Sequence, residues 1–278
     1  MAVEMGAVFG AALRELRAQP VVVRVRADVG DVTVIDTTAA RLVWEPRRVV
    51  SVYAVPVADI AGRLVAPVGS AGRVEPEAAG LPPVLTPRQP FAVHSAGGTA
   101  YDIETDVATL PGAAYVVDDP DLDGYALVDW TSFTRWYEED QEAVGHPRDP
   151  FHRIPCLPSS RHVVVEVGGQ VISDTRRPTL LLETGLPPRW YVPCEDVRMD
   201  LLTPSETRTT CAYKGHAGYW STTAGGTDLP DIAWSYKDPR HDANEVRDLL
   251  CFYAEHTDTV VDGDRGGRPV TEWSGSRV

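Results

Sequence analysis

The feature that most constrains this chain of 278 residues is an internal repeat. Residues 29–59 (VGDVTVIDTTAARLVWEPRRVVSVYAVPVAD) align with residues 167–196 (VGGQVISDTRRPTLLLETGLPPRWYVPCED). The spacing is 138 residues and falls to 137 after a single deletion, as seen for Asp36 with Asp174, Glu45 with Glu183, Pro56 with Pro193 and Asp59 with Asp196. A duplicated segment predicts that both halves of the chain share one fold.

Two later matches extend the repeat at smaller spacings. Tyr101 aligns with Tyr219, and WYEE at 136–139 aligns with FYAE at 252–255. The order is preserved while the spacing shrinks, which is what loop deletions in the second copy would produce.

Each copy reads mainly as strand. The β-branched runs VVVRVRA (21–27) and HVVVEVGG (162–169) have strand length, and VTVID or QVISD follows after a Gly-containing turn. We therefore expect a mainly β chain made of two tandem small curved antiparallel β-domains, related by a pseudo-twofold, with a few short helices.

Apolar spacing predicts three short helices, over residues 4–18, 131–143 and 242–256. The Pro- and Gly-rich residues 66–90 predict an irregular loop. The expected organisation is an N-terminal helix (1–19), a first, degenerate β copy (20–144), a junction (145–158), a second β copy carrying the site (159–265) and a tail (266–278).

Composition excludes several classes of function. The formal net charge of −14 argues against binding to nucleic acid or anionic lipid, both of which need clustered Lys and Arg. The chain has no apolar run of about 20 residues and no signal-peptide pattern at its start. The four cysteines form no CxxC pair. We expect a cytoplasmic protein with reduced thiols.

The residues richest in chemistry lie between 183 and 236. Seven aromatic side chains are interspersed there with a few charges, as the walls of a small-molecule pocket require. The alternative is a sheet core with aromatic cross-strand pairs. The candidate catalytic residues are Lys214, Glu183 and Tyr213, and the candidate substrate-binding residues are Arg189, Tyr191, Tyr219, Trp220, Trp234 and Tyr236.

This half of the chain resembles a known family. The runs HPRDPFHRIPCLPSSRHVVVEV, ETGLPPRWYVPCEDVRMDLLTPSETRTTCAYKGHAGYWS, IAWSYKDP and VVDG are similar to actinobacterial proteins of domain of unknown function 427. The resemblance is close over 120–275 and looser over 20–70. It implies a small curved antiparallel fold of the β-tent kind, which encloses a ligand pocket in some relatives and holds zinc in others.

Two departures from the family limit what the resemblance implies. The paired cysteines that such a zinc site requires are missing, and Ala254 and His256 replace the family's usual Asn and Arg. The family is sometimes labelled nucleotidyltransferase-like, but the chain has neither paired metal-binding aspartates after Gly-Ser nor a phosphate-cradling Gly-rich loop.

Other catalytic patterns are missing from the sequence. HExxH and GxSxG are absent, so we expect no metal, no cofactor and no common hydrolase triad. Charged residues crowd the junction, where they either pin the copies or line a cleft: His146, Arg148, Asp149, His152 and Arg153.

The leading hypothesis is a cofactor-free enzyme that performs acid–base or cyclisation chemistry on a small organic molecule, of the secondary-metabolite type for example. A non-catalytic ligand-binding module and a structural oligomerisation domain are the alternatives, and a homo-oligomer is compatible with each. The site lies within the second copy or between the copies. Lys214 would bind an anionic group, act as an acid or base, or form a Schiff base.

Overall fold

The computed structural model describes residues 2–67, 82–271 and 274. Part of the predicted loop (68–81) and part of the predicted tail (272–273 and 275–278) lie outside the described residues. The described parts of the loop, at 66–67 and 82–90, contain neither helix nor strand.

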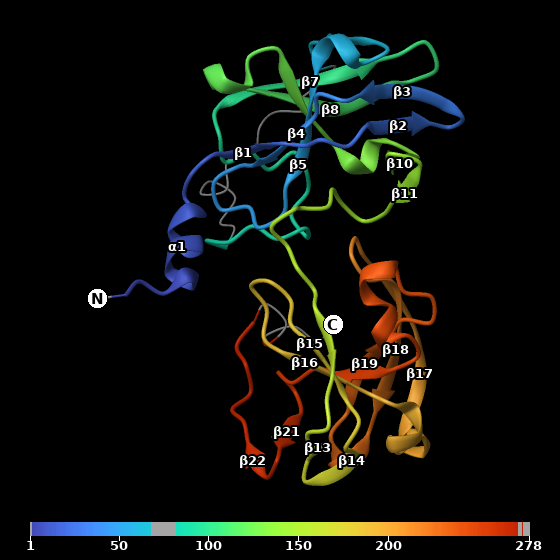
Figure 1. Cartoon of the computed structure of the whole chain (residues 1–278). Helices are drawn as coiled ribbons and strands as arrows, with labels where there is room; N and C mark the ends of the chain where they lie inside the picture. The colour runs from blue at the N-terminus through green and yellow to red at the C-terminus, as the bar shows by residue number, and fades with distance from the viewer. Residues whose placement is uncertain (1, 68–81, 272–273, 275–278) are drawn as a thin grey trace. The chain divides into compact units, whose positions relative to one another are not determined.

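The chain separates into two compact units, residues 1–149 and 150–278 (Figure 1). Each unit contains a seven-stranded and a four-stranded sheet, and their strands pair antiparallel. The prediction of a mainly β chain with two tandem antiparallel β units is confirmed. No helix in the described ranges is long and apolar enough to cross a membrane.

In the first unit, the seven-stranded sheet has the order β1 (Arg17–Pro20), β4 (Arg41–Trp44), β5 (Val52–Pro56), β9 (Tyr125–Val128), β8 (Thr109–Val117), β7 (Gly98–Glu104) and β6 (Arg63–Val65). The four-stranded sheet has the order β11 (Gln141–Ala143), β10 (Arg135–Glu138), β2 (Val25–Val29) and β3 (Val32–Thr37). The helical segments are α1 (Met5–Ala12) and the 3-10 turns Val57–Asp59, Pro120–Leu122 and Trp130–Ser132.

In the second unit, the seven-stranded sheet has the order β12 (Cys156–Pro158), β15 (Thr179–Leu181), β16 (Arg189–Val192), β20 (Leu250–Phe252), β19 (Leu229–Ser235), β18 (Gly215–Thr222) and β17 (Leu202–Cys211). The four-stranded sheet has the order β14 (Gln170–Thr175), β13 (Val163–Val167), β21 (Asp258–Val261) and β22 (Asp264–Arg265). The 3-10 turns are Cys194–Asp196, Met199–Leu201, Ala224–Gly226 and His241–Val246.

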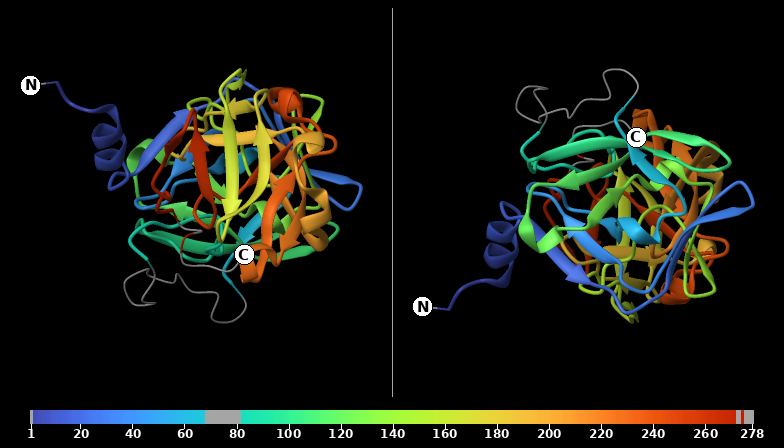
Figure 2. Two further views of the ribbon diagram at one scale, coloured as in Figure 1. Left: turned by 90° about the horizontal axis from the view of Figure 1, so that it is seen from below. Right: turned by 90° about the horizontal axis from the view of Figure 1, so that it is seen from above.

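The two units have the same topology, because each strand of the first unit has a counterpart at the same place in the sheet order of the second. The first hairpin repeats residue by residue: Val25 pairs with Thr37, and Val163 pairs with Thr175. A β-bulge interrupts both ladders after the third pair. In the left view of Figure 2, the yellow β13 and β14 lie beside the red β21.

The later sequence matches of the repeat are wrong. Tyr219 pairs with Trp234 as Ala100 pairs with Tyr115, so Ala100 and not Tyr101 is the counterpart of Tyr219. The WYEE segment at 136–139 belongs to β10, whose counterpart is β21 and not residues 252–255. Loops of different length separate these strands, so spacing no longer identifies the equivalent residues.

Both faces of each seven-stranded sheet are buried. In the first unit, one face joins the main core through Leu42 and Val55, whereas Val43 and Ala54 belong to a separate small cluster on the other face. In the second unit, a single core cluster contains residues of both faces, including Val192. We call the face that carries Val43 and Ala54 in the first unit the second face of the sheet. It forms a separate cluster in the first unit but part of the single core in the second, so it is where the two units differ.

The N-terminal helix is shorter than predicted. α1 ends at Ala12 instead of continuing to residue 18, and none of its residues is buried (Figure 1). Arg17 begins β1, pairs with Trp44 and donates to the backbone oxygen of Arg48 at 2.7 Å. Pairing at the sheet edge thus ends a helix that packs against no core.

The helix predicted over 131–143 is wrong. This segment forms the hairpin of β10 and β11, with Glu139 at φ 54 in its turn. Trp136 faces Ala27 of β2 and is buried in the main core. Tertiary packing of this tryptophan in a sheet overrides the local helical pattern.

The helix predicted over 242–256 is also wrong. A 3-10 turn ends at Val246, and Asp248 adopts a left-handed φ of 59 that no α-helix contains. β20 then fills the middle of the seven-stranded sheet between β16 and β19. The apolar Leu250 is therefore buried by strand neighbours and not by a helix face.

We expect Gly168→Ala to destabilise the second unit more than Gly169→Ala. Both glycines have positive φ, 55 and 80, so both substitutions share the strain of a left-handed alanine. A Cβ at Gly168 would lie 2.8 Å from the backbone oxygen of Gly225, whereas one at Gly169 meets nothing within 4 Å. The difference should be about 1–3 kcal/mol in urea unfolding. Equal losses would contradict this close packing.

Candidate functional site

One row of side chains crosses four neighbouring strands on the second face of the sheet in the second unit. Tyr191 on β16 faces Cys251 on β20. Cys251 in turn faces Trp234 on β19, and Trp234 faces Tyr219 on β18. Directly opposed residues in antiparallel strands point to the same face. All four side chains are buried, and we call this surface the aromatic face.

The polar tips of the aromatic face are hydrogen-bonded to one another or to the neighbouring strand. Trp234 Nε1 donates to the hydroxyl of Tyr191 at 3.0 Å, and the hydroxyls of Tyr219 and Thr209 lie 2.7 Å apart. Burial raises the pKa of Tyr191 and of Tyr236 well above the usual 10. Both phenols are therefore neutral, and Tyr191 orients Trp234 by its hydrogen bond.

A buried ion pair borders the aromatic face. Arg189, two residues before Tyr191, donates from Nη1 and Nη2 to Glu255, both at 2.7 Å. The side chains of the pair are 5 % and 0 % exposed. The guanidinium also lies over the rings of Trp234 and Tyr253, 5.6 and 5.9 Å from their centroids. This bidentate pair fixes β16 to the segment after β20 and adds no net charge.

A second buried cluster centres on Glu183. Lys214, in the turn between β17 and β18, donates from Nζ to Glu183 Oε2 at 2.6 Å. The other oxygen, Oε1, lies 3.1 Å from Nε2 of His152. The imidazole stacks on Tyr213, with ring centroids 4.3 Å apart. One carboxylate thus joins two titratable side chains. We call His152, Glu183 and Lys214 the Glu183 triad.

Glu183 and Lys214 stabilise each other's charge. Burial alone would raise the pKa of Glu183, but His152 and Lys214 outweigh it and lower this pKa to about 2. Burial alone would lower the pKa of Lys214, but Cys211 and Glu183 outweigh it, so this pKa is raised. At neutral pH the cluster therefore holds a carboxylate and an ammonium group.

The structure brings most of the predicted site residues together. Tyr213, which stacks on His152 of the triad, belongs to the same core cluster as Tyr191, Tyr219, Trp234 and Tyr236. Trp220 is the exception. It follows Tyr219 in β18, so its side chain points to the opposite face, where it packs partly buried against the core.

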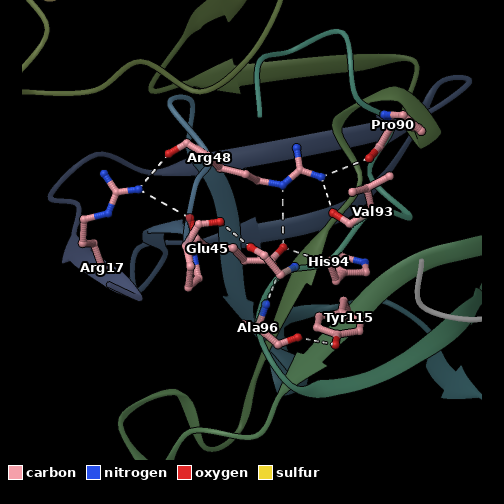
Figure 3. A network of polar contacts seen from close by, with 10 residues as sticks. Arg17, Glu45, Arg48, Pro90, Val93, His94, Ala96 and Tyr115 are labelled. Atoms are coloured by element: carbon pink, nitrogen blue, oxygen red, sulfur yellow. Dashed lines mark hydrogen bonds and ion pairs between the residues drawn. The ribbon is translucent and has the colours of Figure 1, made fainter. Parts of the chain in front are cut away.

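In the first unit, Glu45 occupies the position of Glu183 but has different partners (Figure 3). Its Oε1 lies 2.8 Å from Nδ1 of His94, which is 2 % exposed. Its Oε2 accepts the backbone N–H groups of Ser95 and Ala96 at 2.8 and 3.0 Å. The guanidinium of Arg48 also lies 3.8 Å from Oε1. Three donors of one loop and one buried cation thus surround this carboxylate, and the interaction pins the loop to the sheet.

The aromatic face also has a different counterpart in the first unit. Strand pairing places Ala54, Leu127, Tyr115 and Ala100 where the second unit has Tyr191, Cys251, Trp234 and Tyr219. The hydroxyl of Tyr115 donates to the backbone of Ala96. Small and aliphatic residues therefore give the first unit an apolar cluster, whereas the second unit has a face rich in hydrogen-bonding aromatics.

The site residues lie in the part of the chain that matches a known family. Residues 155–263 match the family model described as domain of unknown function DUF427. The resemblance of this half of the chain to DUF427 is confirmed. The matched range contains Glu183, Lys214 and the aromatic face, and it begins after His152. A comparison with curated proteins gives no match. Within the described ranges, no group of three or more His, Cys, Asp or Glu side chains is arranged to hold a metal ion.

Sequence reasoning missed Glu255 as a partner of Arg189 and left His152 among the junction residues. Both residues come from segments far in sequence from their partners, so local patterns do not reveal the pairing. One signal in the sequence does single out Lys214. The chain contains 24 arginines but only two lysines, Lys214 and Lys237. In a chain whose basic residues are nearly all arginines, a lysine marks a position where a compact ammonium group acts differently from a guanidinium group.

We expect Arg189→Met to destabilise the second unit by about 3–5 kcal/mol, because the buried Glu255 carboxylate loses its cation. Replacing both partners by apolar residues, as in Arg189→Met with Glu255→Leu, should restore part of the loss. Arg177→Met, which breaks an exposed pair with Asp196, is the control and should change stability little. Chemical denaturation measures all three, and a small effect of Arg189→Met would show that the pair is dispensable.

The stability contributed by Glu183 should depend on pH in one direction. Its pKa in the folded chain, about 2, lies below the value of about 4.3 in an unfolded chain. Its contribution is therefore complete above about pH 4.5 and is lost as the pH falls towards 2, by about 3 kcal/mol in total. The difference in unfolding free energy between wild type and Glu183→Gln should shrink over this range. A constant difference would mean that the carboxyl titrates normally.

Proposed function

We propose that the second unit binds a small organic molecule at the aromatic face and catalyses acid–base chemistry on it without a cofactor. The observation that carries the proposal is the buried Glu183 carboxylate shared by Lys214 and His152. Buried ion pairs are weak devices for stability, because apolar residues of similar volume often serve as well. Coupled titratable groups with shifted pKa values gather at functional sites.

The roles follow from the geometry of each group. Lys214 and Glu183 supply the acid and its counter-charge, and Tyr213 holds the imidazole of His152 by stacking. The hydroxyls of the aromatic face offer hydrogen bonds in a desolvated environment, and Arg189 with Glu255 forms a neutral wall beside them. The substrate-binding residues of the proposal are Tyr191, Tyr219, Trp234 and Tyr236. Trp220 is not among them, because it lies on the opposite face.

The difference between the two units supports a function located in the second. Both keep a buried glutamate at the same position beside a histidine, but the first adds two backbone N–H groups and the guanidinium of Arg48. The second uses Lys214 with His152, and a lysine ammonium group, unlike a guanidinium group, can release its proton during a reaction. A purely structural pin needs only the first arrangement, so the second has the property that chemistry requires.

A non-catalytic ligand-binding module is the second candidate. It is favoured by the complete pairing of the charges, since a sensor needs shape and hydrogen bonds but no free acid or base. Ligand turnover separates it from the enzyme. A structural oligomerisation domain would bind no small molecule at this face, and a homo-oligomer is compatible with either ligand-binding function.

We expect Lys214→Met to weaken binding of small organic molecules by at least tenfold, or about 1.4 kcal/mol. A library of uncharged aromatic carbonyl compounds and aromatic carboxylates, screened by ligand-observed NMR, identifies binders of the wild type. Consumption of each binder, followed by mass spectrometry, then tells an enzyme from a binding module. Lys237→Met is the matched control, because it removes the exposed lysine of the same unit. Equal affinity of all binders for wild type and Lys214→Met would place the site elsewhere.

A further inference from the structure

The members of the Glu183 triad differ in their access to solvent. The side chain of His152 is 21 % exposed, whereas those of Glu183 and Lys214 are 10 % and 9 % exposed. The two oxygens of Glu183 hold one neighbour each. The triad is therefore a linear chain of hydrogen-bonding groups that begins near solvent and ends at a buried ammonium group.

We propose that His152, Glu183 and Lys214 form a proton relay, and that Lys214 donates its proton to an oxygen of an uncharged substrate such as a carbonyl compound. This inference rests on the proposed function for the identity of the acceptor. The relay itself is a property of the chain alone, and it makes His152 a positioning and proton-transfer residue.

The charge state of Lys214 favours a proton donor over the other roles of a buried lysine. Its pKa is raised, because Cys211 and Glu183 outweigh the effect of burial, so the amine is protonated at neutral pH and is no nucleophile for a Schiff base. Its positive charge is already balanced by Glu183 at 2.6 Å, so an anionic substrate would have to compete with that carboxylate. Donation to a neutral oxygen uses the proton without separating the pair first.

The other titratable groups around Lys214 are poor proton carriers. Burial raises the pKa of the Cys156 thiol to about 11 and that of the Cys251 thiol to about 12. Both thiols stay neutral over the physiological range and deliver no proton at neutral pH. Cys211 touches Lys214 from the end of β17 and is partly exposed, yet a thiol is a weak hydrogen-bond donor. Glu183 and His152 therefore provide the better route.

One cycle of the relay returns every group of the protein to its starting protonation state. When Lys214 donates its proton, the positive charge beside Glu183 disappears and the pKa of that carboxyl rises. Glu183 Oε1 then takes the proton from the imidazolium Nε2 of His152. A half-turn about the Cγ–Cδ bond of Glu183 brings this proton to Nζ of Lys214. Solvent returns a proton to His152, whose side chain is 21 % exposed.

The position of His152 is set by contacts that do not involve the relay. Its ring stacks on Tyr213. The backbone N–H of the next residue, Arg153, donates to the side-chain hydroxyl of Thr184, and the backbone oxygen of Arg153 accepts the N–H of Thr184. These contacts hold the imidazole at the carboxylate from a loop that precedes β12. His152→Phe should therefore keep the stacking and remove only the proton-carrying Nε2.

The experiment measures exchange of the lysine ammonium protons with water by ¹⁵N NMR on lysine-labelled full-length protein, without any substrate. Only two lysine signals arise, and Lys237 is the internal reference. We expect His152→Phe to slow exchange at Lys214 by roughly tenfold or more, as expected when a positioned acid–base group is lost, and to leave Lys237 unchanged. His162→Phe is the matched control, because it removes an imidazole paired with the more exposed Asp174.

An unchanged or faster exchange rate at Lys214 in His152→Phe overturns the relay, and so does an equal slowing in His162→Phe. If His152→Phe fails to fold, His152→Gln replaces it, since its amide can still donate a hydrogen bond to Glu183 but is neither an acid nor a base at neutral pH. Failure of the relay is distinguishable from failure of the proposed function. Loss of ligand binding in Lys214→Met with unchanged exchange in His152→Phe would keep the function and remove the relay.

Discussion

Each unit is organised around one buried carboxylate, which lies just after β4 or β15, the second strand of its seven-stranded sheet. Glu45 and Glu183 occupy this position, where Glu45 accepts the backbone N–H of Ala96 and Glu183 accepts the ammonium group of Lys214. Desolvating a carboxylate is costly unless its lone pairs are satisfied. The chain before β7 or β18 must therefore always supply donors, and the choice of donors decides whether the position only holds the fold or also carries chemistry.

The first part of the repeat could be predicted to the residue, because strands β2–β5 and β13–β16 are joined by loops of nearly equal length. Spacing failed beyond that, as shown by Tyr219, whose counterpart is Ala100. The two wrong helices have one cause. Trp136 and Leu250 show helical spacing locally, but each is buried by strands that are distant in sequence. Such non-local pairing overrides local propensity.

The candidate site could be predicted in composition but not in connectivity. Aromatic density and the CAYKG segment marked the strands that form the aromatic face, because a strand that carries polar-tipped aromatics shows this in its own sequence. The sequence did not reveal which residues pair with these side chains. Glu255 is 66 residues from Arg189, and His152 is 31 residues from Glu183. Trp220 was misplaced because alternation along β18 separates it from Tyr219, and the register of a strand follows from its neighbours.

Duplication offers a physical reason why a buried charged cluster is tolerated here. The first unit forms the same topology with Ala54, Leu127 and Ala100 along the row that holds Tyr191, Cys251 and Tyr219 in the second. The fold therefore does not require a tyrosine or a cysteine at these three positions. A fold that is stable with an apolar cluster can accept a desolvated triad in its copy, provided that every charge is paired. Lys214 and Arg189 each pair with a separate glutamate, which meets that condition. The proton on Lys214 of the triad is then available for the proposed chemistry.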